Sequence, residues 1–211
     1  MATMQSLHDV FVHELRDLYS AERQLIKALP KMAKNAGNPQ LADALTNHLR
    51  ETEVQVERIE EILKTLGVKS GGVKCKGMEG LIEEGEEVLA MDGDARALDA
   101  AMIGAAQRVE HYEIAGYLAA ISHAKAQGHT EAARLLEETL KEERNADEIL
   151  TEIAQQGLAD VADTSTMGEA ISVAFPTPPV RANGKSRGAT TRKNGAKKGG
   201  KTRAKSSGRS R

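Results

Sequence analysis

The sequence contains no tryptophan, only two phenylalanines and three tyrosines, and a single cysteine, Cys75. With so few large rings, the core must be built from Leu, Ile, Val, Ala and Met, as the core of a helical bundle can be. One cysteine excludes an internal disulfide, which suits a reducing cytosol. No apolar run approaches the roughly 18 residues of a membrane-spanning helix, and the N-terminus lacks the basic and apolar regions of a secretory signal. We therefore expect a helical, cytoplasmic protein that does not bind membranes.

Acidic residues are absent from the end of the chain. Residues 176–211 contain 12 Lys and Arg, whereas residues 1–175 carry 17 basic and 31 acidic side chains, a net charge of −14. The basic segment has almost no apolar side chains, so it cannot bury enough surface to fold. We predict that it binds DNA through phosphates, without reading bases, which would associate the protein with the nucleoid. The alternatives are a solubilising tail, or a tail folded back on the acidic part of the chain.

Residues 194–205 (NGAKKGGKTRAK) are similar to the basic tails of histone-H1-like proteins. The predicted nucleic-acid-binding residues are Arg181, Lys185, Arg187, Arg192, Lys193, Lys197, Lys198, Lys201, Arg203, Lys205, Arg209 and Arg211.

Apolar residues recur at helical spacing in four long stretches, which predict helices over residues 4–34, 40–66, 96–126 and 131–156. A shorter amphipathic stretch predicts a fifth helix over residues 78–91. A short loop joins the first long helix to the second, and another joins the third to the fourth, so each pair forms an antiparallel hairpin. A crossover of about thirty residues joins the two hairpins. One long crossover between the second and third long helices is the connection of ferritin-like bundles. The predicted fold is therefore an all-α, ferritin-like four-helix bundle.

Glycine and proline mark the expected boundaries. Gly37 is expected to cap the first helix and Gly157 to end the fourth long one. We assign residues 1–160 to the bundle, residues 161–175 to a linker with a short helix at Thr166–Phe175, and residues 176–211 to a disordered tail.

Three polar residues lie on one face of the third long helix. Glu110, Glu113 and Tyr117 are spaced i, i+3 and i+7, next to apolar neighbours. Carboxylates on a half-buried stripe cost free energy unless their charge is compensated, and a metal ion would compensate it. The alternative is a solvated acidic face of an ordinary helix.

The rest of the chain brings further carboxylates to the same level. The spacing Tyr19-x-x-Glu22 recurs 91 residues later as Glu110-x-x-Glu113, and Glu51-x-x-x-Gln55 recurs 92 residues later as Glu143-x-x-x-Asp147. Residues equidistant from the turn of an antiparallel hairpin lie at one height. Glu22 is therefore level with Glu51 or Thr52, and Glu113 with Glu143. Four helices that bring carboxylates together predict a site for two metal ions, Fe, Mn or Mg.

The candidate metal ligands are Glu22, His48, Glu51, Gln55, Glu110, Glu113, Glu143 and Asp147. His48 can supply a nitrogen ligand or make an ordinary polar contact. Glu142 competes with Glu143 for the ligand position, and Tyr19 or Tyr117 is expected to donate a hydrogen bond to the site. Without metal, we expect several carboxyl groups to have raised pKa values and to share protons.

Five separated motifs resemble the YciE/YciF family of stress-associated, ferritin-like bacterial proteins, which is related to rubrerythrin and bacterioferritin. The motifs are residues 14–25 (ELRDLYSAERQL), 48–55 (HLRETEVQ), 75–85 (CKGMEGLIEEG), 110–113 (EHYE) and 140–143 (LKEE). The resemblance implies a ferritin-like bundle and a homodimer, but no settled reaction. This sequence departs from rubrerythrin by lacking the Glu-x-x-His motifs, with Gln55 and Asp147 near the positions of the histidines.

Two functional hypotheses follow. In the first, a di-iron or di-manganese centre reduces peroxide or oxygen in the stress response, with a DNA-binding tail attached. In the second, the protein is not an enzyme: it protects or organises DNA, and the carboxylates of the bundle are structural.

Overall fold

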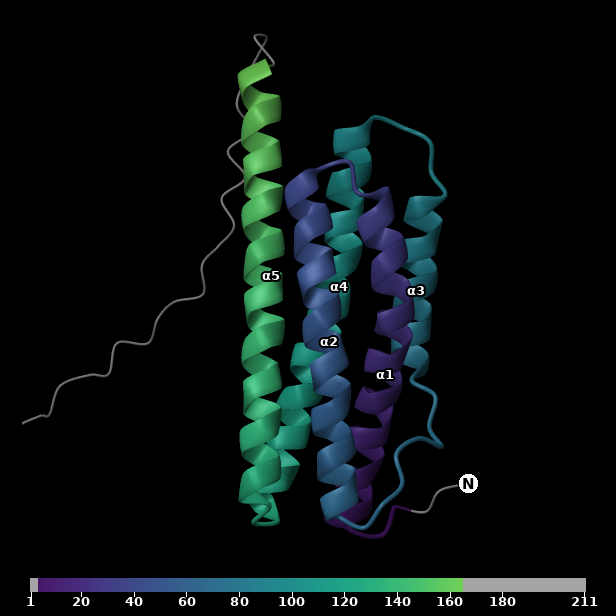
Figure 1. The fold of residues 1–211 in the computed structure, drawn as a ribbon, viewed down its shortest axis with the longest axis vertical. Helices are drawn as coiled ribbons and strands as arrows, with labels where there is room; N and C mark the ends of the chain where they lie inside the picture. The colour runs from purple at the N-terminus through teal and green to yellow at the C-terminus, as the bar shows by residue number, and fades with distance from the viewer. Residues whose placement is uncertain (1–3, 165–211) are drawn as a thin grey trace, which may run out of the picture. The chain divides into compact units, whose positions relative to one another are not determined.

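The computed structural model describes residues 4–164, with side chains for residues 4–157, and this part of the chain forms five helices and no strand (Figure 1). The helices are α1 (Leu7–Asn35), α2 (Pro39–Thr65), α3 (Lys76–Leu89), α4 (Ala95–Ala126) and α5 (Thr130–Thr164). The helix predicted at Thr166–Phe175 and the basic tail lie outside the described residues.

Two antiparallel hairpins, α1 with α2 and α4 with α5, form a four-helix bundle. Helix α1 also contacts α4, and α2 contacts α5, so the four long helices enclose one core. The crossover between the hairpins carries α3, which lies on the outside against α1 and α4 (Figure 1). The prediction of an all-α, ferritin-like bundle is confirmed.

Polar side chains satisfy the free N–H groups at the helix starts. Ser6 and Asp9 form a reciprocal capping box at α1, Asn38 precedes the proline that begins α2, and Asp94 accepts from two backbone N–H groups of α4. Helix α3 begins after Cys75, whose thiol accepts from the N–H of Met78.

The prediction that Gly37 is the C-cap of α1 is wrong. The C-cap is Ala36, in an extended conformation. The N–H of Gly37 instead donates to Asp99 Oδ1 on α4 at 2.8 Å, and a Cβ at position 37 would lie 3.1 Å from Asp99 Oδ2. Glycine at this position allows close approach between the first hairpin and α4.

The predicted end of α5 at Gly157 is also wrong. Gly67 and Gly128 have φ angles of +70° and +74° and follow the ends of α2 and α4 as expected, but α5 continues through Gly157 to Thr164. A glycine inside a helix costs only about 1 kcal/mol relative to alanine, so it does not by itself end a helix.

Two apolar clusters fill the bundle at different heights. On α1, Leu18 belongs to one cluster and Leu25 to the other; on α5, Leu140 and Leu150 are divided in the same way. A layer of buried polar residues lies between the clusters, because each helix places them between its two apolar segments.

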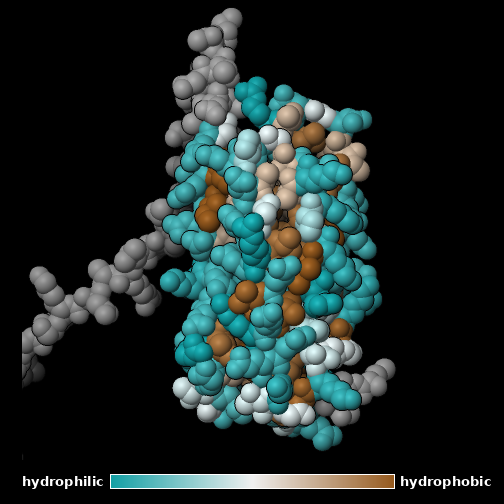
Figure 2. Space-filling view, in the orientation of Figure 1, coloured by the Kyte–Doolittle hydropathy of each residue, from teal (hydrophilic) through white to brown (hydrophobic). Residues whose placement is uncertain are grey.

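The visible surface of the bundle is mostly hydrophilic, with apolar residues in narrow patches between charged ones (Figure 2). Within residues 4–164, no helix combines the length and the apolar composition needed to cross a bilayer.

Candidate metal centre

The polar layer consists of four glutamates and a histidine from the four long helices. Glu22 comes from α1, His48 from α2, Glu110 and Glu113 from α4, and Glu143 from α5. None of the five is more than 5% exposed. The two apolar clusters pack above and below this layer.

Four of these residues converge on one point. His48 Nε2 lies 3.4 Å from Glu110 Oε1 and 3.8 Å from Glu143 Oε2. One ligand atom each from His48, Glu110, Glu113 and Glu143 can be chosen so that all four lie within 4.8 Å of one another. Oxygen and nitrogen ligands about 2.0–2.6 Å from a common ion lie at such separations. This buried group could hold a metal ion.

Glu22 lies beside the group and is held by a phenol. The hydroxyl of the fully buried Tyr117 donates a short hydrogen bond to Glu22 Oε1, whereas Glu22 Oε2 has no partner. Burial, followed by the nearby carboxylates of Glu22 and Glu143, raises the pKa of Tyr117 well above its usual value, so its hydroxyl remains a donor. Tyr19, the other candidate donor, binds Glu60 at 2.7 Å instead.

Unpartnered polar atoms are concentrated in this layer. Among the described side chains, ten buried nitrogen or oxygen atoms have no hydrogen-bond partner, and eight of them belong to the layer. The eight are Glu22 Oε2, both ring nitrogens of His48, Glu110 Oε2, and both carboxyl oxygens of Glu113 and of Glu143; Gln55 Oε1, on the inward face of α2, is a ninth unpartnered atom. Each such atom costs about 1–3 kcal/mol if nothing binds it. A set of convergent lone pairs suits divalent cations that prefer oxygen and imidazole ligands.

Burial and mutual repulsion raise the pKa of every carboxyl group in the layer. Burial, then the charge of Glu143, raises the pKa of Glu22 to about 8, and burial, then the charge of Glu22, raises that of Glu110 to about 8. The same causes hold the pKa values of Glu113 and Glu143 well above the usual range. The metal-free site therefore retains protons at neutral pH, and metal binding would release them.

His48 experiences two opposing effects. Burial lowers the pKa of its imidazole, but the nearby carboxylate of Glu51 and the charges of Glu143 and Glu22 outweigh burial and raise it. Its Nδ1 lies 3.6 Å from Glu51 Oε2, on the side away from Glu110. A carboxylate behind one ring nitrogen fixes the orientation of the imidazole and leaves the other nitrogen for a metal.

Glu51 itself is not inside the layer. Its side chain is 39% exposed, whereas Thr52 and Gln55 are fully buried. His48, Thr52 and Gln55 are spaced i, i+4 and i+7, so they share the inward face of α2, and Glu51 lies at its edge. The hydroxyl of Thr52 donates to the His48 carbonyl at 2.9 Å. Of the two residues that counting from the turn placed level with Glu22, Thr52 is therefore the buried one.

Glu142 points away from the layer, and Glu143 points into it. Arg58 donates to both carboxyl oxygens of Glu142 at 2.5 and 2.8 Å, and Gln55 Nε2 donates to the same carboxylate at 3.2 Å. Arg58 was not among the predicted site residues, although its cationic side chain one turn from Gln55 offers a partner for a nearby carboxylate.

Asp147 lies outside the four-residue group. Its oxygens are 3.3 Å from Gln107 Nε2 and 3.2 Å from His111 Nε2, and its side chain is partly exposed. Through these contacts, Asp147 links the side chains of α5 to those of α4 near the site.

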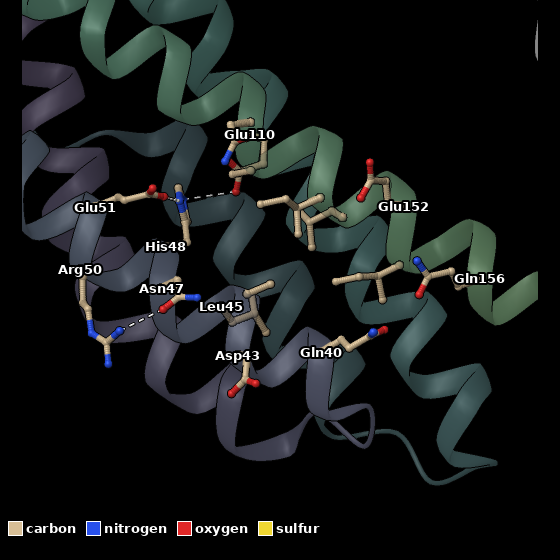
Figure 3. Close-up of a pocket in the computed structure, with 16 residues that line it drawn as sticks. Gln40, Asp43, Leu45, Asn47, His48, Arg50, Glu51, Glu110, Glu152 and Gln156 are labelled. Carbon is tan, nitrogen blue, oxygen red and sulfur yellow. Dashed lines mark hydrogen bonds and ion pairs between the residues drawn. The ribbon is translucent and has the colours of Figure 1, made fainter.

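An open groove of about 730 Å³ reaches the layer between α2 and α5 (Figure 3). His48 and Glu110 lie at its inner end, with Glu51 beside them, and both apolar and polar side chains of the two helices line the rest. No spacing in the sequence indicated this groove, because the face that each helix turns toward it depends on packing.

The chain is similar to known proteins over the whole bundle. A family model described as a domain of unknown function (DUF892) matches residues 6–162. Protein YciF of Escherichia coli K12 is 46% identical over 152 residues, which cover 72% of this chain and 92% of that protein. The crystal structure of the E. coli stress protein YciF has a TM-score of 0.72 at 44% identity, covering 74% of this chain and 99% of that one. YcfI of Rhodopseudomonas palustris has a TM-score of 0.68 at 45% identity, covering 70% and 94%.

Proposed function

The chain belongs to the DUF892 family, and we propose that it is a di-metal carboxylate protein of the oxidative or general stress response. The observation that carries this proposal is the buried layer of four glutamates and His48 with its eight unpartnered atoms. The stress response is suggested by the description of its relative YciF as a stress protein.

The charge of the layer supports two ions. The four glutamates carry a charge of −4 when ionised, and among the described residues no Lys or Arg forms an ion pair with any of them. Two divalent cations would balance this charge. His48, Glu110, Glu113 and Glu143 would hold one ion, and Glu22, with its free Oε2, would contribute to holding the second, with shared carboxylates between them.

Iron or manganese would supply the electrons for reducing peroxide or oxygen. The residues of the chain would supply the surroundings of this chemistry. The hydroxyl of Tyr117 holds Glu22 in place, and Glu51 orients His48 from the solvent side. The groove gives water and small substrates access to His48 and Glu110.

Metal analysis of the full-length protein tests the proposal. After anaerobic loading with Fe(II) or Mn(II), we expect two ions per chain, and loss of at least one in a Glu143→Gln variant. Glu148→Gln, an exposed position on the same helix, is the matched control and should retain both. A bundle that binds no metal, or a Glu143→Gln variant that binds as much as the control, would contradict the metal site. Loaded protein that reduces peroxide and oxygen no faster than this variant would contradict the enzymatic role.

A second function is favoured by the basic tail, with its 12 cationic and no acidic residues. We propose that it binds DNA through phosphates, either beside the metal chemistry or as the main role of a protein whose carboxylates are structural. A homodimer would place two tails on one particle and increase the avidity without new contacts.

Gel-shift titrations measure this binding. If six to ten phosphates are contacted, the affinity should fall by about 10³- to 10⁵-fold between 50 and 200 mM salt and should not depend on DNA sequence. A chain ending at Phe175, with its charge of −14, should not bind. Equal binding by the truncated chain, or no binding by the full-length chain at low salt, would refute the role of the tail.

A further inference from the structure

The groove between α2 and α5 is far larger than oxygen or hydrogen peroxide requires. Its volume is about 730 Å³, whereas a water molecule occupies about 30 Å³ of liquid. Because the groove ends at His48 and Glu110, whatever fills it lies next to the proposed metal centre.

Most of the groove is apolar. Leu45 on α2 and Ile149, Leu150 and Ile153 on α5 line it, and Ile149 remains 37% exposed. Gln40 and Asp43 lie across from Glu152 and Gln156 at the far end from His48 (Figure 3). A long apolar wall that ends at a polar, reactive site is suited to an organic molecule with one polar end.

The charges at the rim select against anions. Asp43, Glu51 and Glu152 contribute three negative charges, and Arg50, which is the one Lys or Arg among the lining residues, donates to Asn47 at 2.9 Å. An excess of negative charge around a partly apolar groove lowers the local concentration of anionic ligands. The groove is therefore complementary to neutral molecules.

We propose that the groove binds the organic part of a neutral alkyl or aryl hydroperoxide, with the peroxide group at His48 and Glu110. This inference rests on the proposed di-metal function and names its substrate class. Two bound Fe(II) or Mn(II) ions held by the layer would supply the two electrons that break the O–O bond and would become Fe(III) or Mn(III), and the two protons would be taken up from the solvent. The products are an alcohol and a water molecule.

The groove can be tested without turnover, using alcohols of the product class. Butan-1-ol, hexan-1-ol and octan-1-ol are titrated into the full-length, metal-free protein, and the NMR signals of the Ile149 and Leu45 methyl groups are followed. Burial of each added methylene should strengthen binding by about two- to fourfold. Octanoate should bind at least tenfold more weakly than octan-1-ol.

Two variants and a control locate the binding. Ala44→Phe fills the groove and Ile149→Gln makes its wall polar, so each should weaken octan-1-ol binding at least tenfold. Val54→Gln changes a residue of similar exposure, 44%, that does not line the groove, and should have no effect. Because Ile149 is partly exposed, its variant should stay folded, which circular dichroism checks. In metal-loaded protein, Ile149→Gln should slow the reduction of cumene hydroperoxide at least fivefold more than that of hydrogen peroxide, whereas Val54→Gln should change neither rate.

The outcomes separate the two proposals. If metal is bound and hydrogen peroxide is reduced, but the alcohols do not bind or their affinity does not rise with chain length, the groove inference is overturned and the proposed function stands. If the alcohols bind but no metal does, the proposed di-metal function is overturned. The assignment of a hydroperoxide as the substrate is then overturned too. Equal slowing of both peroxides by Ile149→Gln would also overturn the assignment of the groove.

Discussion

Replacing Glu110 by glutamine should stabilise the metal-free protein at neutral pH. Glutamine has nearly the shape of a protonated glutamate but does not titrate. Burial, then the charge of Glu22, raises the pKa of Glu110 to about 8, so the folded protein binds a proton that the unfolded chain releases. Wild-type stability therefore falls as the pH rises from the unfolded pKa, about 4.3 for Glu, toward 8.

The size of the effect follows from that shift. At 1.36 kcal/mol per pH unit, one such carboxyl reduces the free energy of unfolding by roughly 3 kcal/mol between pH 4.5 and pH 7. For a protein of this size, that corresponds to a melting temperature lower by about 6–12 °C. His48 acts in the same direction, because its raised pKa also makes the folded state bind the extra proton above the unfolded value. The Glu110→Gln variant removes the loss of stability that Glu110 causes. It also reduces the loss that Glu22 causes, because Glu22 no longer has the charge of Glu110 beside it.

Thermal melts of metal-free wild type, Glu110→Gln and the exposed control Glu148→Gln, from pH 4.5 to 8, measure the effect. The variant and wild type should melt together at pH 4.5 and diverge by several degrees at pH 7, with the control following wild type. With Mn(II) or Fe(II) at about 100 times the dissociation constant, wild type should gain about 2.7 kcal/mol per site and the variant less. A metal-free wild type whose melting temperature does not fall with pH, or a variant less stable than wild type at pH 7, would refute the reasoning.

Two further predictions concern single contacts. Tyr117→Phe removes the hydroxyl that donates to Glu22, so it should destabilise the metal-free protein by about 1–3 kcal/mol and raise the pKa of Glu22 further. Chemical denaturation measures the change in stability, and an unchanged midpoint would show that this hydrogen bond is not formed. On α3, Gly77→Ala would place a Cβ 2.6 Å from the Tyr112 ring and should lower the free energy of unfolding by about 1–3 kcal/mol. Gly80→Ala meets no atom within 4 Å and should raise it by up to about 1 kcal/mol. Equal effects of the two variants in chemical denaturation would contradict the packing of α3.

The fold was predictable because local signals and hydrophobic spacing agree along most of the chain. The helix expected over residues 96–126 is found at Ala95–Ala126, since Asp94 caps its start and Gly128 turns left-handed after its end. The glycine at position 157 wrongly predicted the end of α5. A glycine inside a helix costs about 1 kcal/mol relative to alanine, which is small compared with the other interactions that hold a long helix together.

The height of the site was predictable, but the rotation of each helix was not. Counting from the turns placed Glu22, Glu113 and Glu143 at one level, and the structure buries all three there. The same counting left Glu51 and Thr52 equivalent on α2. One residue is a rotation of about 100° around a helix axis, and only side-chain packing decides which of two neighbours faces inward.

The choice between Glu142 and Glu143 shows what one partly buried cation, Arg58, contributes to the site. Both residues are carboxylates on the same turn of α5, so no spacing distinguishes them. Arg58 decides by binding Glu142 through two nitrogens, and the interaction with Glu142 raises the pKa of its guanidinium. With Arg58 engaged there, its charge is not available to Glu143, which lies inside the bundle with both oxygens unpartnered. The buried carboxylates must then be neutralised by protons or by metal ions, and this competition is the physical reason to expect that metal uptake releases protons and reverses the pH dependence of stability.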